Sequence, residues 1–202
     1  MADNPRRMHR PEEFNEFYSG TPPWDIGHPQ AVFQALADAG ELRGKVLDAG
    51  CGTGEHTLMA ARIGLDAIGI DAAPAAIALA EAKAHDRNIA ARFLVHDALR
   101  LPDLGTQFDT VLDSGLFHVF DDSDRRTYVQ NLKAAIAPGG HYFMLCFSER
   151  QPGEGGPRRV SQAEIRDSFS DGWRVDAIDP AILQTRLDPP DIQGWFARIT
   201  RI

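Results

Sequence analysis

Short apolar runs alternate with longer stretches of mixed polarity along most of the chain. Apolar runs that end at glycine or aspartate are typical of buried strands, and stretches with one apolar face are typical of helices. The pattern predicts strands at Lys45–Asp48, Ala67–Asp71, Arg92–Asp97, Phe108–Asp113 and His141–Phe147. It predicts helices at Pro11–Tyr18, Gln30–Ala39, Glu55–Ile63, Pro74–His85 and Asp124–Ala137. This alternation predicts right-handed βαβ units and an α/β fold with a mostly parallel sheet covered on both faces.

The C-terminal part departs from this alternation. Ser161–Phe169 predicts a helix that begins with a capping box. Trp173–Ile178 and Trp195–Ile202 predict two last strands joined by a proline-containing linker, which suits a closing antiparallel hairpin. The polar Gly/Pro-rich segment Ser148–Arg159 is either a plain surface loop or a lid beside the site.

The length of 202 residues suits one hydrophobic core. We predict a single domain, with residues 1–40 as a helical cap and residues 41–202 as the core. No apolar run approaches the roughly 20 residues that a membrane-spanning helix needs. The polar N-terminus lacks the apolar region of a secretory signal, and the two cysteines, Cys51 and Cys146, lie in segments that look buried, with no disulfide framework around them. We therefore predict a reduced, cytoplasmic protein without membrane contact.

The net charge of the chain indicates which class of substrate it can bind. The formal net charge is -8, and the arginine pairs at 6–7, 125–126 and 158–159 are short and scattered. A protein that grips a phosphate backbone usually carries a basic patch, so nucleic acid is disfavoured as a substrate. No metal is predicted, because Asp113 and the acids near it lack a second ligand at suitable spacing.

A glycine-rich turn, Asp48–Gly54, follows the first predicted strand. Ligands of open α/β sheets bind outside the carboxyl ends of the strands, so this turn is expected to line the site. Its glycines at 50, 52 and 54 let the backbone approach a ligand closely. A dinucleotide fingerprint would place glycine at position 55, where this chain has glutamate, and Asp48 would repel a pyrophosphate. A carboxylate attracts a sulfonium and an ammonium instead, so the charge of Asp48 favours S-adenosylmethionine.

Acidic residues also end the next two predicted strands. Asp71 can accept hydrogen bonds from both hydroxyls of a ribose, and it can alternatively cap the helix that follows. Asp97 can accept from the amine of an adenine while Ala98 offers its backbone N–H, and Asp97 can alternatively cap a turn. Three acids at successive strand ends, together with the glycine turn, favour a ligand site over coincidence.

These segments read VLDAGCGTG, AIGID and FLVHDAL, and together they resemble the first three motifs of class I S-adenosylmethionine-dependent methyltransferases. The resemblance covers residues 45 to about 147. It implies a Rossmann-like sheet of seven strands in the order 3-2-1-4-5-7-6, with the last strand antiparallel. It also implies that S-adenosylmethionine is bound and S-adenosylhomocysteine released. The cofactor-binding residues expected from the motifs and the strand ends are Trp24, Asp48, Gly50, Gly52, Thr53, Gly54, Asp71, Ala72, Asp97, Ala98 and Asp113.

Two further segments resemble particular families within the class I methyltransferases. The stretch PPWDIGHPQ at 22–30 looks like the entry motif of bacterial small-molecule methyltransferases related to thiol, halide and thiopurine methyltransferases. FDTVLDSGLFHVF at 108–120 is similar to the fourth-strand motif of mycobacterial-type heterocyclic toxin methyltransferases. The Asn/Asp-Pro-Pro-aromatic signature of DNA-base and protein-glutamine methyltransferases is absent from this position.

Residues of the fourth-strand turn are the candidates for catalysis. His118 is placed to act as a general base, because its ordinary pKa is near neutrality, or alternatively to orient the acceptor or cap a helix. Asp113 is expected to steady the cofactor or its ammonium group. The aromatic residues of the first helix, Phe14, Phe17 and Tyr18, either cover the site or pack on the core, and Trp24 is expected at the site.

The predicted function is methyl transfer from S-adenosylmethionine to an S, N or O atom of a small, aromatic or heterocyclic molecule, in detoxification or secondary metabolism. One alternative is a catalytically silent S-adenosylmethionine-binding regulator. The other is an NAD-dependent oxidoreductase.

Overall fold

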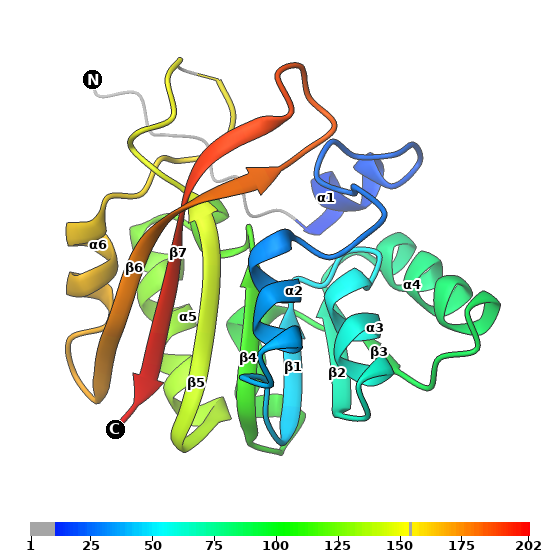
Figure 1. The fold of residues 1–202 in the computed structure, drawn as a ribbon, viewed down its shortest axis with the longest axis horizontal. Helices are drawn as coiled ribbons and strands as arrows, with labels where there is room; N and C mark the ends of the chain where they lie inside the picture. Colours follow the sequence, from blue (N-terminus) through cyan, green and yellow to red (C-terminus); the bar gives the residue numbers. More distant parts are fainter. Residues whose placement is uncertain (1–10, 154) are drawn as a thin grey trace.

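The first strand shows how the sheet is buried on both faces. The computed structural model describes residues 11–153 and 155–202 (Figure 1). In β1 (Lys45–Ala49), Val46 points into one apolar cluster and Leu47 into another, and neither is exposed. Side chains of successive strand residues point to opposite faces, so a strand that is apolar on both faces needs cover on both.

One sheet contains all seven strands, in the order β3-β2-β1-β4-β5-β7-β6, as predicted. β1 to β5 are parallel, and β7 runs antiparallel to both β5 and β6. The remaining strands are β2 (Asp66–Asp71), β3 (Arg92–Val95), β4 (Phe108–Ser114), β5 (Ile136–Phe147), β6 (Trp173–Gln184) and β7 (Asp191–Arg201).

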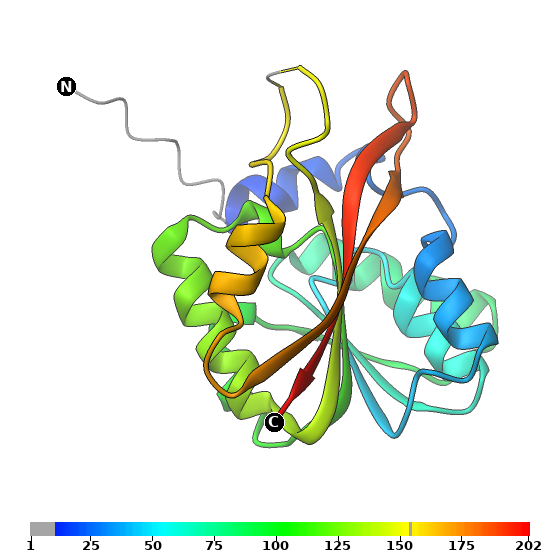
Figure 2. The same cartoon turned by 60° about the vertical axis from the view of Figure 1, so that its left-hand side comes forward.

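Helices cover the two faces in separate layers (Figure 2). α2 (Ala31–Asp38) and α3 (Glu55–Arg62) pack on one face, and α4 (Pro74–Asp86) joins them over β3. α5 (Asp122–Ala135) and α6 (Gln162–Ser168) cover the other face, together with the 3-10 helix η1 (Ala98–Leu104). The short helix α1 (Pro11–Phe17) lies over the carboxyl end of the sheet, and the 3-10 turn η2 (Phe117–Val119) follows β4.

The C-terminal hairpin is longer than the sequence predicted. The residues assigned to a linker form a continuous ladder, in which Pro180 pairs with Trp195 and Leu183 with Ile192. The proline is tolerated because β6 is the edge strand, where its missing N–H removes no ladder bond. The hairpin tip therefore projects beyond the carboxyl end of the sheet, beside the residues that precede α2 (Figure 1).

Other predicted boundaries differ by a few residues. The α5 helix ends at Ala135, and β5 already begins at Ile136, so the Pro-Gly-Gly segment lies inside the strand. The capping box that begins α6 is present: Ser161 accepts from the N–H of Glu164, and the Glu164 carboxylate accepts from the N–H of Ser161. The N-terminus that was interpreted as lacking a secretory signal lies mostly outside the described residues. No helix in the described ranges is long and apolar enough to cross a membrane.

Candidate functional site

A cavity of about 570 Å³ opens at the carboxyl ends of the parallel strands. Turns after β1, β2, β3 and β4 form one part of its wall, as expected for an open α/β sheet. The other part comes from the N-terminal cap, which we define as residues 11–30, from the described residues of the loop 151–159 (151–153 and 155–159), and from the hairpin tip 183–192. The predicted site residues that line it are Trp24, Gly50, Gly52, Thr53, Asp71, Ala72, Ala98 and His118.

The glycine loop, residues 48–54, uses its glycines in two ways. Gly50 and Gly52 line the cavity with positive φ, and a Cβ on Gly52 would lie 3.1 Å from the hydroxyl of Tyr18. Gly54 also has positive φ but begins α3, and its Cβ would lie 2.7 Å from the Phe93 ring. Gly54 is therefore needed for packing of the helix, whereas the other two leave room beside the cavity.

Asp71 connects the loop to the end of β2. Its carboxylate accepts from the backbone N–H of Gly52 and of Ala73, each at 2.9 Å, and the residue lines the cavity. A carboxylate has about four acceptor positions, so these two bonds are compatible with a ribose contact. Asp71 is not the N-cap of α4, because Ala73 holds that position, and the ribose contact stays a prediction.

Asp48 lies beneath the glycine loop and does not line the cavity. It is 1% exposed, and one oxygen accepts from both the N–H and the hydroxyl of Thr57, at 3.0 and 2.8 Å. Burial raises its pKa to about 6, against the effect of the Thr57 hydrogen bonds. The predicted direct contact with the cofactor is therefore not what the structure shows. The carboxylate fixes the loop to α3 through Thr57.

At the end of β3, Asp97 and Ala98 have different places relative to the cavity. Ala98 lines the cavity. Asp97 is absent from the lining, and its carboxylate accepts from the N–H of Leu99 at 2.8 Å as the cap of η1. Its position thus supports the capping interpretation and not the predicted adenine contact.

Charged side chains brace the start of α3 from α4 and from the cap. Lys83 Nζ bonds to the Thr53 hydroxyl and to Glu55, and lies 3.5 Å from Asp25 of the cap. Arg87 adds two hydrogen bonds to Glu55, at 2.7 and 2.9 Å. Burial alone would raise the pKa of Glu55, but the bonds from Arg87 and Lys83 lower it below its usual range. Glu55 therefore stands as a carboxylate at the position where a dinucleotide fingerprint has glycine.

Asp113 is also placed differently from the prediction. It has no exposed surface and does not line the cavity. Four hydrogen bonds hold its carboxylate: from the N–H groups of Leu116 and Phe117 and from the hydroxyls of Tyr128 and Tyr142. Burial raises its pKa to about 6 despite these bonds. Asp113 shapes the turn after β4 from inside the core, so neither the predicted catalytic role nor the cofactor contact is supported.

His118 does line the cavity, but its basic nitrogen is occupied. Nδ1 accepts a hydrogen bond from the backbone N–H of Phe147 at 3.1 Å, and the residue is 7% exposed. Burial, and then the charge of Arg125, lower its pKa to about 3. In a neutral imidazole whose Nδ1 accepts a hydrogen bond, the ring hydrogen is on Nε2. Nε2 therefore has no free lone pair with which to accept a proton from the acceptor. This geometry favours the alternative interpretation, in which His118 orients the acceptor, over the general base.

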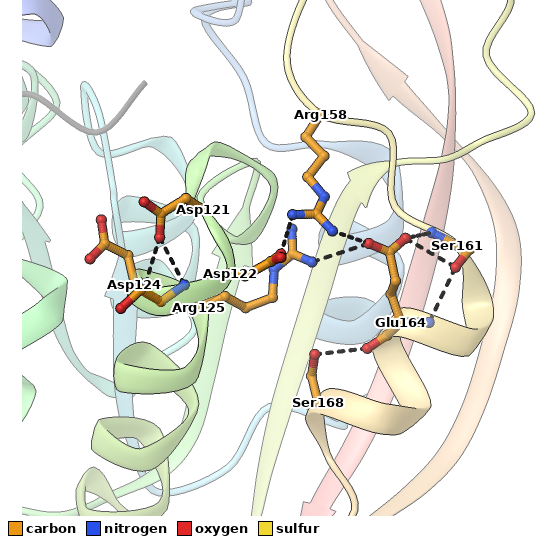
Figure 3. A network of polar contacts seen from close by, with 9 residues as sticks. Asp121, Asp122, Asp124, Arg125, Arg158, Ser161, Glu164 and Ser168 are labelled. Carbon is orange, nitrogen blue, oxygen red and sulfur yellow. Dashed lines mark hydrogen bonds and ion pairs between the residues drawn. The ribbon is translucent and has the colours of Figure 1, made fainter. Parts of the chain in front are cut away.

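Arg125 belongs to a charged network behind the turn (Figure 3). Its guanidinium lies 4.5 Å from the centre of the Phe117 ring and 3.5 Å from Glu164, and it is only 5% exposed. Arg158 joins Asp122 at the start of α5 to Glu164 in α6 (Figure 3). This network fixes a positive charge close to His118, a feature that the scattered arginine pairs in the sequence did not reveal.

His56 is a cavity residue that sequence reasoning missed. Its Nε2 accepts from the backbone N–H of Gln30 at 3.1 Å, and burial lowers its pKa to about 4. The only sequence signal was its place in the first turn of the helix after the glycine loop. Among the described residues, no group of three or more His, Cys, Asp or Glu side chains could hold a metal ion.

The cap brings its aromatic residues to the cavity mouth. Trp24 donates from Nε1 to the Tyr18 hydroxyl at 3.1 Å, and its ring packs 5.1 Å from that of Phe17. Phe14, Trp24 and Tyr18 line the cavity, while Phe17 supports them from the outer side. Burial, and then the nearby Asp71 carboxylate, raise the pKa of Tyr18 well above its usual range. The two interpretations of the aromatic residues, cover and packing, thus apply to different members of the set.

The outer wall is assembled from segments far apart in sequence. Gln30 bonds through its amide to both the N–H and the carbonyl of Gln184, at 2.8 and 2.9 Å. Leu183, Leu187 and Ile192 of the hairpin tip face the cavity. Arg159 binds backbone carbonyls of the loop 151–159, including that of Gln151 at 3.0 Å. The loop therefore lies beside the cavity, as the lid alternative requires.

The residues present fit S-adenosylmethionine. Gly50 and Gly52 leave space that a Cβ would fill, Asp71 offers a carboxylate at the end of β2, and the surrounding surface is mainly apolar. Such a site suits a nucleoside that carries a cationic amino-acid chain. The fold and the site together define an open α/β enzyme that binds a nucleoside cofactor.

Comparisons with known proteins identify the family of enzymes to which the chain belongs. A family model described as a methyltransferase domain matches residues 46–140. The 2-heptyl-1-hydroxyquinolin-4(1H)-one methyltransferase of Mycobacteroides abscessus is 38% identical over 191 residues, which is 93% of this chain and 82% of that protein. The chain belongs to the S-adenosylmethionine-dependent methyltransferases. This excludes the NAD-dependent alternative.

Two solved structures agree with this assignment. One, described for the conversion of a disulfide bond into a thioacetal group during echinomycin biosynthesis, is 36% identical with a TM-score of 0.86, covering 95% of this chain and 93% of that one. The magnesium protoporphyrin IX methyltransferase of Synechocystis PCC 6803 with bound S-adenosylhomocysteine is 20% identical with a TM-score of 0.69, covering 85% and 80%. The second likeness concerns the fold alone.

Proposed function

We propose that this enzyme transfers the methyl group of S-adenosylmethionine to a heteroatom of a small, apolar heterocycle, with an oxygen atom as the preferred acceptor. The observation that carries the proposal is the composition of the cavity's outer wall. Leu183, Leu187 and Ile192 from the hairpin tip line the same cavity as Trp24 and Phe14 of the cap. Flat and aliphatic side chains of this kind suit a planar ring with an alkyl substituent.

On the cofactor side, residues of this chain would bind and orient the methyl donor. Gly50 and Gly52 would lie along its amino-acid arm, Asp71 would accept from the ribose hydroxyls, and Ala72 and Ala98 would border the adenine. When bound, the cofactor supplies an activated methyl on a sulfonium. The protein's main task is then to align the acceptor and exclude water, which the cap and the loop 151–159 would do.

The relative from Mycobacteroides abscessus supports the choice of acceptor, because its name specifies a hydroxyquinolinone with an alkyl chain. We extend that class of acceptor, and not the specific compound, to this chain. The cellular role that we favour is detoxification or secondary metabolism of such heterocycles. We also propose that the described chain folds as one domain and acts in the cytoplasm.

An acceptor panel tests this proposal. Purified enzyme, S-adenosylmethionine and matched hydroxyquinolinones, phenols, thiols and ring-nitrogen heterocycles are incubated, and both products are quantified by mass spectrometry. We expect the highest kcat/KM for alkyl-substituted hydroxyquinolinones, with the new methyl on oxygen. Tight cofactor binding without methylation of any acceptor would instead favour a silent S-adenosylmethionine-binding regulator.

A further inference from the structure

His118 presents a proton donor to the cavity. Its Nδ1 is occupied by the N–H of Phe147, and Nε2 makes no hydrogen bond within the described part of the chain yet is not sealed off in the core. A Cβ on Gly115, another cavity residue, would lie 3.6 Å from Nε2. In a neutral imidazole, the nitrogen opposite an acceptor nitrogen carries the hydrogen. The nitrogen available to a ligand is therefore N–H and not a lone pair.

The surroundings of His118 keep the ring in this state. Phe147 and Gly115, which pack against the ring, carry no charge. The charged group that acts on it is the Arg125 guanidinium of α5, whose position is set by Glu164. A fixed positive charge opposes protonation of the ring, and at the same time strengthens an N–H that points toward an anion.

We infer that, in the methyl transfer proposed above, His118 donates its Nε2–H to an oxygen of the acceptor, which loses its own proton to water before transfer. Arg125 is a positioning residue, because it acts through His118 and does not line the cavity. This inference rests on the proposed function and deepens it by specifying the acceptor class. The acceptor would be a heterocycle whose hydroxyl ionises near neutral pH, with a negative oxygen or a neighbouring carbonyl for His118 to bind.

The chemical step balances without a protein base. The hydroxyl proton of the acceptor passes to bulk water, leaving an oxyanion. A lone pair of that oxygen forms the new bond to the methyl carbon as the bond between carbon and sulfur breaks. The electron pair of the broken bond stays on sulfur, so the sulfonium becomes a neutral sulfide. Acceptors with weakly acidic hydroxyls are disfavoured because little of the oxyanion is present.

The pH dependence of kcat/KM tests the inference. It is measured with wild-type enzyme over pH 5–9 for acceptors that share one ring skeleton but differ in hydroxyl pKa. We expect the acidic limb of each profile to move with the pKa of the acceptor. An acidic limb that stays at one pH for all acceptors and disappears in His118→Phe would overturn the inference in favour of a base on the enzyme.

Variants of His118 provide a second measurement. His118→Phe should lower kcat/KM for oxygen acceptors roughly 10- to 100-fold without moving the acidic limb, because a hydrogen bond to a charged group is lost. His118→Gln, which retains an N–H donor, should recover part of the loss. The matched control is His85→Gln, on an exposed histidine of α4, which should match the wild type. Equal rates in wild type and His118→Phe would contradict the inference.

Nitrogen NMR of the histidine rings gives a result that does not depend on turnover. At pH 7, we expect the His118 signals of a neutral ring with the hydrogen on Nε2, both in the free enzyme and with S-adenosylhomocysteine added. In Arg125→Gln, the ring should titrate at higher pH than in wild type. A protonated ring, or a hydrogen on Nδ1, would overturn the inference. If the proposed function itself were wrong, the result would be a different one: no acceptor in the panel would be methylated.

Discussion

The two walls of the cavity differ in how the chain builds them. The cofactor wall comes from consecutive strand ends between residues 50 and 98, so its parts are near one another in sequence. The outer wall, where we place the acceptor and which we call the acceptor wall, consists of the cap, the loop 151–159 and the hairpin tip 183–192. These segments are far apart in sequence and meet only in the folded protein. The comparison teaches that the cofactor is specified by local motifs, whereas acceptor choice depends on contacts between distant segments.

The largest effect is expected at Asp71 of the cofactor wall. Asp71→Ala removes a charged acceptor, worth roughly 1.5–3 kcal/mol for such a bond, and should weaken S-adenosylmethionine binding roughly 10- to 150-fold. Asp97→Ala is the matched variant, because that carboxylate caps η1 outside the cavity lining. Isothermal titration calorimetry measures both. If Asp97→Ala weakened binding as much as Asp71→Ala, the adenine contact predicted from sequence would be restored.

Gln30 tests how the acceptor wall is held together. Gln30→Ala removes both amide bonds to Gln184, which should lower the free energy of unfolding by about 1–3 kcal/mol and raise the KM of the acceptor. The Kd of the cofactor should change by less than about twofold, within the scatter expected of distant sites. Gln34→Ala, whose amide bonds only to exposed Asp38, is the control. A selective loss of cofactor affinity in Gln30→Ala would break the separation of the two walls.

His118, in the turn after β4, should make the stability of the protein depend on pH. The pKa of His118 is about 3 when folded and about 6.5 when unfolded, so below pH 6.5 the unfolded chain binds a proton that the folded chain does not. His118 therefore costs stability as the pH falls, by up to about 1.4 kcal/mol per pH unit. Relative to wild type, His118→Gln should gain stability between pH 6.5 and 5.5.

Denaturant unfolding at pH 7.5, 6.5 and 5.5 measures this difference. Comparing variant with wild type cancels the opposing contributions of Asp48 and Asp113, whose raised pKa values make the folded state bind protons first as the pH falls. His85→Gln, on an exposed ring of α4, is the control variant. A stability difference that stays constant across the three pH values would mean that His118 is not buried in its neutral form.

The smallest effect is expected at the hairpin tip. Leu187 lines the cavity mouth while 48% of its surface is exposed, so Leu187→Ser should leave stability almost unchanged. Losing part of an apolar contact, worth about 1 kcal/mol, should raise the KM of an alkyl-substituted acceptor about fivefold. The KM of the same ring without its alkyl chain should hardly change. If both acceptors were affected equally, the hairpin tip would not be the wall for an alkyl chain.

Sequence reasoning recovered the parts of this protein that depend on neighbours along the chain. The strand order and the glycine loop followed from alternation, spacing and resemblance. The roles of Asp48 and Asp113 did not, because a strand-end carboxylate can turn toward the ligand or into the core. Hydrogen bonds to Thr57 and to Tyr128 and Tyr142 decide the matter, and they form only in the fold.

The structure of the acceptor wall could not be predicted from the sequence either. Pro180 suggested a linker, but an edge strand tolerates proline, and the hairpin extends to the cavity. The state of His118 depended on one backbone N–H, that of Phe147, from a strand 29 residues away. No spacing rule in the sequence carries that information.

The most direct test of the account follows the methyl group itself. S-adenosylmethionine with a ¹³C-labelled methyl is incubated with wild-type enzyme and an alkyl-substituted hydroxyquinolinone, and the product is examined by NMR. We expect one labelled methyl on the oxygen of the heterocycle and an equal amount of S-adenosylhomocysteine. Label on sulfur or nitrogen acceptors alone, or cofactor that binds and is never consumed, would contradict it.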